Sequence, residues 1–114
     1  MLAGMTAAPS PHRTNAWLAL EAHAAETAGL HTRELFDDDP KRFARMHVDL
    51  PGLLFDYSKH GVTDETLALL TALARERGVE EARAAMFRGD AINVTEQREV
   101  LHTALRAASD EGLR

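Results

Sequence analysis

Histidines are the first residues of this sequence that could carry chemistry, as metal ligands or as general acids and bases. There are six of them, spread along the chain: His12, His23, His31, His47, His60 and His102. No two have the i, i+4 spacing of ligands on one helix or the i, i+2 spacing of ligands on one strand. His102 falls on a predicted apolar helix face, where a partly buried structural histidine is more common than a catalytic one. The histidines therefore predict no metal site and no catalytic base.

Three consecutive carboxylates, Asp37 to Asp39, could supply oxygen ligands to a cation. The run lacks the spacing and the glycine of an EF-hand loop. Asp39 directly before Pro40 is typical of an N-cap followed by proline in the first helical turn. We therefore interpret this run as helix capping rather than as a cation site.

Arginines are frequent in the second half of the chain, where they could bind phosphate or nucleic acid. Acidic residues match them: Arg75, Arg77, Arg83, Arg88, Arg98 and Arg106 stand against Glu76, Glu80, Glu81, Asp90, Glu96 and Glu99. The segment from Thr63 to Arg88 is spaced like a helix-turn-helix, but its second helix would offer DNA only two arginines beside two glutamates. Together with the net charge of −5, this disfavours a nucleic-acid partner.

Other site motifs do not change this picture. The chain has no cysteine, and we find no glycine-rich phosphate loop and no nucleophile elbow. Asn93-Val94-Thr95 matches a glycosylation sequon, but the first residues do not resemble a secretory signal, and Asn93 is better explained as a helix cap. From the residues we assign no catalytic, cofactor-binding or metal-binding position.

Length and composition indicate one small folded unit or a piece of a larger one. The 114 residues are 45% apolar and 27% charged, as in soluble globular chains, but only 5% are aromatic, so a core would be thin. No apolar run is long enough to span a membrane. The lack of cysteine is compatible with a reducing cytoplasm, which is where we expect the protein.

The positions of apolar residues, caps and breakers predict a mainly helical segment with one short strand pair. After a disordered tail over residues 1–13, a helix capped by Thr14 or Asn15 is expected at 14–28, with Trp17, Leu20 and Ala24 on one face. Further helices are expected at 32–38 and at 40–45. Two strands with a Pro51-Gly52 turn are expected between Met46 and Tyr57. Helices should follow at 63–78, 79–89 and, capped by Asn93 with Glu96, from there to about Ala107.

Three ordered blocks of the second half resemble the amino-terminal portion of the glucose-6-phosphate isomerase family. The blocks are Asp56-Tyr57-Ser58-Lys59 followed by Thr63-Asp64-Glu65-Thr66-Leu67; then Met86-Phe87-Arg88-Gly89-Asp90-Ala91-Ile92-Asn93; then Thr95-Glu96-Gln97-Arg98 and Val100 to Arg106. The resemblance extends from about Trp17 to Arg106. It implies that residues 14–107 form the N-terminal helical segment of a larger α/β sugar-isomerase fold, and that 108–114 are a truncated C-terminal end.

The resemblance also implies a function for the whole enzyme. Family members interconvert glucose 6-phosphate and fructose 6-phosphate through an enediol, in glycolysis and gluconeogenesis, without a metal or nucleotide cofactor, and are commonly homodimers. Their catalytic glutamate, histidine and lysine and their phosphate-binding loops lie downstream of this segment, so no catalytic residue is carried over. We therefore expect the fragment alone to be inactive. The alternative is a free-standing helical protein-interaction module, and the coding sequence after Arg114 would distinguish the two.

Overall fold

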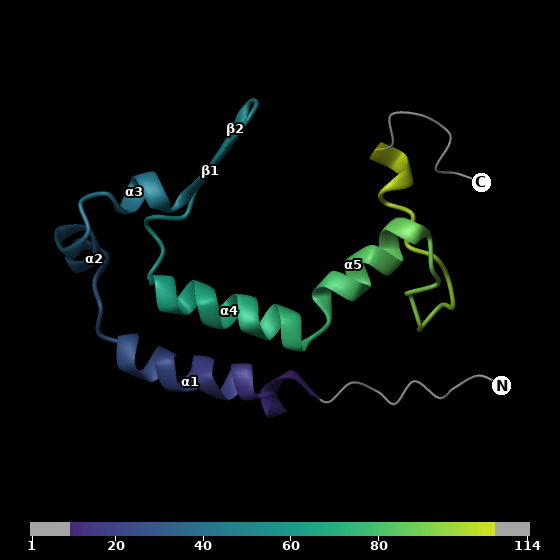
Figure 1. The fold of residues 1–114 in the computed structure, drawn as a ribbon, viewed down its shortest axis with the longest axis horizontal. Helices are drawn as coiled ribbons and strands as arrows, with labels where there is room; N and C mark the ends of the chain where they lie inside the picture. Colours follow the sequence, from purple (N-terminus) through teal and green to yellow (C-terminus); the bar gives the residue numbers. More distant parts are fainter. Residues whose placement is uncertain (1–9, 107–114) are drawn as a thin grey trace. The chain divides into compact units, whose positions relative to one another are not determined.

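The computed structural model describes residues 10–106, which divide into two compact units at Leu73 and Ala74 (Figure 1). The first unit contains a 3-10 turn and most of the regular structure: η1 (Pro11–Arg13), α1 (Asn15–Thr27), α2 (Thr32–Asp38), α3 (Arg42–Arg45), β1 (His47–Leu50) and β2 (Leu53–Asp56). Helix α4 (Asp64–Glu76) begins in this unit and ends in the second, which also holds α5 (Val79–Arg88) and η2 (Ala104–Arg106). The mainly helical class with one strand pair, expected from the sequence, is confirmed.

Helix α1 begins at a side-chain cap, as the sequence predicts. The Thr14 hydroxyl accepts a hydrogen bond from the backbone N–H of Trp17, at 3.3 Å. The buried residues of α1 are Ala16 and His23, seven positions apart and therefore on one face, whereas Trp17 and Leu20 are half-buried and Ala24 is exposed. Burial on α1 follows a polar contact with α4 rather than the apolar pattern.

Helix α3 begins two residues later than the proline pattern predicts. Its N-cap is Lys41, and Asp39 still has a capping role because its carboxylate accepts the backbone N–H of Lys41 at 3.0 Å. The carbonyl of Asp39 accepts the N–H of Arg42 at 3.0 Å. Pro40 therefore lies in the turn that leads into α3 and not in the helix itself.

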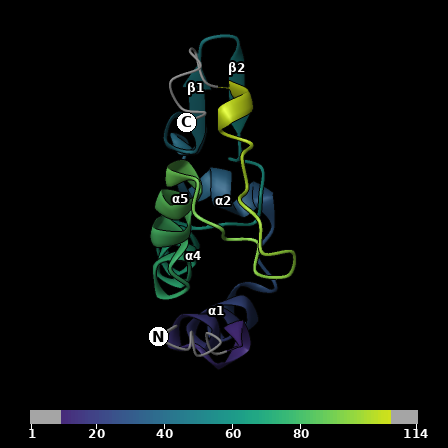
Figure 2. The same ribbon diagram turned by 90° about the vertical axis from the view of Figure 1, so that its right-hand side faces the viewer.

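Strands β1 and β2 form the antiparallel hairpin expected from the sequence. Val48 pairs with Phe55 and Leu50 with Leu53 across a turn in which Gly52 has φ +79°, a conformation that glycine adopts without a Cβ penalty. Figure 1 shows the hairpin projecting away from the helices of the same unit, and Figure 2 shows its two strands joined at the far end by this turn.

Two glycines bound α5 as predicted. Gly78 precedes the helix with φ +67°, and Gly89 ends it with φ +76°, its N–H donating to the carbonyls of Ala85 and Met86. Both positions require the left-handed region, which disfavours any residue with a Cβ.

The helix expected from Asn93 to about Ala107 does not form over the described residues, and this prediction was wrong. Asn93 pairs with Arg98 in an isolated bridge, and one 3-10 turn follows at Ala104–Arg106, while Ala107 lies outside the described residues. Leu101 and Leu105 remain 46% and 84% exposed. A helix of about fourteen residues is marginal in water unless such an apolar face is packed.

Candidate functional site

The junction between β2 and α4 holds a cluster of polar contacts. One Asp56 carboxylate oxygen accepts the Ser58 N–H at 2.9 Å and the Ser58 hydroxyl at 2.6 Å, and the other accepts Lys59 Nζ at 2.6 Å. The hydrogen bond from Lys59, followed by those from Ser58, holds the pKa of Asp56 well below its ordinary range. This carboxylate is therefore ionised and committed to its own turn, which leaves it poorly suited to act as a general base.

Arg42 on α3 fixes the chain that follows this turn. Its side chain is buried, with Nε donating to the Ser58 carbonyl at 2.7 Å and Nη2 donating to the carbonyls of His60 and Val62 at 2.9 and 2.6 Å. The guanidinium also lies 5.9 Å from the ring centroid of Phe36. Three backbone carbonyls on one buried guanidinium make this a structural clamp, because Nε and Nη2 are committed to the chain itself.

His23 forms the corresponding contact between α1 and α4, which run antiparallel side by side in the first unit (Figure 1). Its Nε2 lies 2.7 Å from the hydroxyl of Thr66, which also accepts the N–H of Thr63 at 3.0 Å. Its Nδ1 is buried without a hydrogen-bond partner, 3.7 Å from a carboxylate oxygen of Glu65. The Glu65 carboxylate therefore lies on the Nδ1 side of the ring, and the Thr66 hydroxyl lies on the Nε2 side.

Arg45, the last residue of α3, links the turn before that helix to the start of α4 at the surface. It contacts the carboxylate of Asp39 at 2.5 Å and that of Asp64 at 2.9 Å. The hydrogen bond from Arg45 lowers the pKa of Asp39, and the bonds to the two carboxylates raise the pKa of Arg45. Asp39 therefore acts as a turn and ion-pair residue, in agreement with the capping interpretation of the acidic run.

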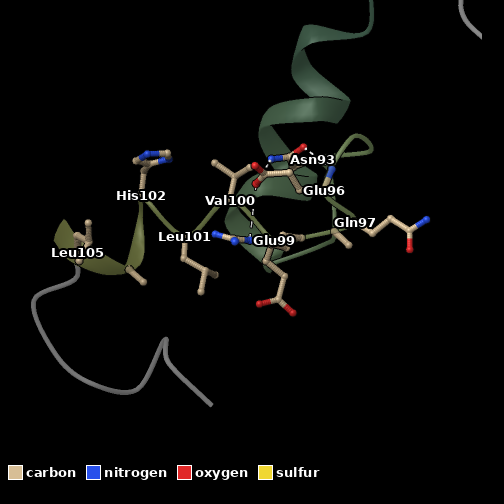
Figure 3. Close-up of a pocket in the computed structure, with 11 residues that line it drawn as sticks. Asn93, Glu96, Gln97, Glu99, Val100, Leu101, His102 and Leu105 are labelled. Carbon is tan, nitrogen blue, oxygen red and sulfur yellow. Dashed lines mark hydrogen bonds and ion pairs between the residues drawn. The ribbon is translucent and has the colours of Figure 1, made fainter.

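The second unit contains an open hollow of about 800 Å³ (Figure 3). Asn93 and Glu96 lie side by side in its lining: Asn93 Oδ1 accepts the Glu96 N–H, and Asn93 Nδ2 donates to the Glu96 carboxylate, both at 3.2 Å. Asn93 thus makes the predicted capping contact, but it closes a turn instead of starting a helix. Glu96 and Glu99 outnumber Arg98 among the charged residues lining the hollow, which does not suit a sugar phosphate.

The histidines named in the sequence are not brought together. Among residues 10–106, no group of three or more His, Cys, Asp or Glu side chains is placed to hold a metal ion. His102 is exposed rather than partly buried, because the helix predicted around it does not form. Over the same range, no helix is long and apolar enough to cross a membrane.

Sequence reasoning missed the importance of Arg42 and His23. Arg42 and Met46 are four residues apart and both buried, but their burial is visible only in the structure. His23 lies one heptad after Ala16 on a helix with few large apolar residues. Polar residues at such positions are usually exposed, so the sequence alone does not predict either role.

The sequence of this chain is similar to those of known proteins. The sequence model of phosphoglucose isomerase matches residues 56–114, beginning at the Asp56 turn described above. The glucose-6-phosphate isomerase of Nitrosospira multiformis is 60% identical over 96 residues, and those of Anaeromyxobacter sp. strain K and Deinococcus radiodurans are 61% identical over 99 and 95 residues. These alignments cover 83 to 87% of this chain but only 18% of each relative's length. The chain belongs to the phosphoglucose isomerase family.

Proposed function

We propose that this chain is the N-terminal part of a glucose-6-phosphate isomerase, which interconverts glucose 6-phosphate and fructose 6-phosphate in glycolysis and gluconeogenesis. The observation that carries the proposal is the match of the family's sequence model to residues 56–114, together with relatives of that name at about 60% identity. The proposal includes residues 14–107 as one segment of the enzyme, between a tail at 1–13 and an end at 108–114.

The role proposed for this segment is structural. Arg42, Asp56 and His23 are engaged by backbone or neighbouring side chains, so none is free to move a proton on a sugar or to hold a phosphate. Isomerisation needs a positioned acid–base group and a phosphate grip, which in the family come from downstream residues. We therefore assign no catalytic, cofactor or metal residue here and expect the 114-residue chain alone to be inactive.

The intact enzyme is proposed to take a sugar phosphate as substrate, to form a homodimer and to work in the cytoplasm, without a metal, nucleic acid or membrane. The alternative remains a helical interaction module without catalysis. The half-exposed apolar residues of the β1–β2 hairpin favour it as a second candidate, because an interaction module would need such a surface.

A coupled assay for hexose-phosphate isomerisation, with chelator present, tests the proposal on two proteins. The first is the 114-residue chain, and the second is a chimera in which this chain's matching segment replaces that of the Deinococcus radiodurans relative. We expect no turnover by the chain and turnover by the chimera. Turnover by the chain above a mock preparation would overturn the assignment of the chemistry to downstream residues. A folded but inactive chimera would favour the interaction module.

A further inference from the structure

One face of the β1–β2 hairpin is made entirely of apolar side chains. Residues directly opposite in an antiparallel pair lie on the same face, so Val48 with Phe55 and Leu50 with Leu53 share this face. Their exposed fractions are 44%, 55%, 52% and 59% in that order. We call these four residues the apolar hairpin face.

The opposite face of the same hairpin is different in character. It carries His47 opposite Asp56 and Asp49 opposite Leu54, and Asp56 is engaged by Ser58 and Lys59. The hairpin is therefore amphipathic across its two faces. A lone two-stranded pair is marginal in water, so an arrangement of this kind indicates that the apolar side is covered in the functional protein.

The size of the apolar hairpin face helps to identify what covers it. Four half-exposed side chains offer at most a few hundred Å² per copy, whereas a stable interface between separate proteins takes about 800 Å² per partner. A second copy docked on this face alone would therefore bind weakly. A segment of the same polypeptide can use such a small surface, because it does not pay the entropy of bringing two molecules together.

We propose that the apolar hairpin face docks on the polypeptide that supplies the remaining length of a full-length isomerase of this family. The chain spans only 18% of the relatives it matches, so most of an intact enzyme lies outside the described structure. This inference rests on the proposed function, since it takes that remainder as the partner.

Two adjacent leucines provide a matched test. Leu53 lies on the apolar hairpin face and Leu54 on the opposite face, and they are 59% and 55% exposed. Leu53→Ala and Leu54→Ala are made both in the 114-residue chain and in the Deinococcus chimera, and urea unfolding is measured for each. In the 114-residue chain both changes should be nearly neutral. In the chimera, Leu53→Ala should lower the folded-to-unfolded ratio by about thirtyfold or more, as for a core leucine, while Leu54→Ala changes it only slightly.

Hydrogen exchange gives a second readout that needs no substitution. Backbone amides of Leu53 to Phe55 should exchange at least about tenfold more slowly in the chimera than in the 114-residue chain. Equal effects of the two alanine changes in the chimera, a larger effect of Leu54→Ala, unchanged exchange, or a chimera that does not fold would each overturn the proposal. So would a stable dimer of the 114-residue chain that Leu53→Ala dissociates, because the occupant would then be a second copy.

These outcomes are separate from those of the proposed function, which is judged by isomerase turnover. A folded, inactive chimera in which Leu53 has become a core residue would refute the function and support the docking surface. An active chimera in which Leu53→Ala is neutral would support the function and refute the docking surface.

Discussion

Replacing Arg42 by methionine should be the most damaging single change in the first unit. Methionine keeps most of the apolar stem but removes all three hydrogen bonds to the carbonyls of Ser58, His60 and Val62. A hydrogen bond from a charged donor contributes about 1.5 to 3 kcal/mol, and the Ser58 contact is buried, so water replaces it poorly. Because the other two acceptors are only partly buried, we expect a total loss of about 3 to 5 kcal/mol in the free energy of unfolding.

Urea unfolding followed by the fluorescence of Trp17, the single tryptophan, measures this loss within the same unit. Arg33→Met is the matched control, because Arg33 is an exposed arginine on α2 and its replacement should change stability by less than about 0.5 kcal/mol. Amide exchange at His60 and Val62 should also accelerate in the Arg42 variant, since both residues lie in the clamped turn. If Arg42→Met and Arg33→Met differ by less than about 1 kcal/mol, the clamp argument is refuted.

Three further predictions concern other parts of the chain. The folded-state pKa of Asp56 is depressed below the ordinary 3.8. The contribution of the Asp56 carboxylate to the free energy of unfolding is therefore complete above pH 3.8 and is lost as the pH falls through the folded-state pKa. When the urea midpoint is measured as a function of pH, it should therefore fall less steeply below pH 3.8 in Asp56→Asn than in the wild type. Asn93→Ala should cost about 0.5 to 2 kcal/mol locally, seen as faster amide exchange at Glu96, without changing sugar-phosphate affinity in the chimera. Gln97→Gly should gain roughly 0.5 kcal/mol in thermal unfolding, because Gln97 holds φ +53° where glycine has no Cβ penalty, and an equal loss would contradict this account.

Local signals were sufficient for the elements that local chemistry determines. The Thr14 cap, the Pro51-Gly52 turn and the glycines at 78 and 89 each act within a few residues, so the starts and ends of α1, the hairpin and α5 followed from the sequence. The conformation of the segment after Asn93 depends on packing against other parts of the protein. Its caps and apolar period are helical, but helix stability at this length comes from packing of the apolar face, which the described residues do not supply.

The site residues were harder to predict than the elements for a related reason. Arg42 is buried because its acceptors are carbonyls 16 to 20 positions further along the chain, and the hydrophobic pattern contains no trace of those acceptors. His23 is buried because a threonine 43 positions away accepts or donates its hydrogen bond. A polar residue can be buried only where the fold brings such a distant hydrogen-bond partner next to it, so its role is visible in the structure and not in the sequence.

Family membership and catalytic competence are therefore separate conclusions for this chain. The turn at Asp56, where the family match begins, is a structural joint in which carboxylate, hydroxyl, ammonium and guanidinium groups satisfy one another and the backbone. Identity of about 60% over such a segment indicates a shared fold, because these contacts need particular side chains whether or not substrate is present. The chemistry of an isomerase must be sought in groups left free to meet a sugar phosphate, and the joints of this segment are not among them.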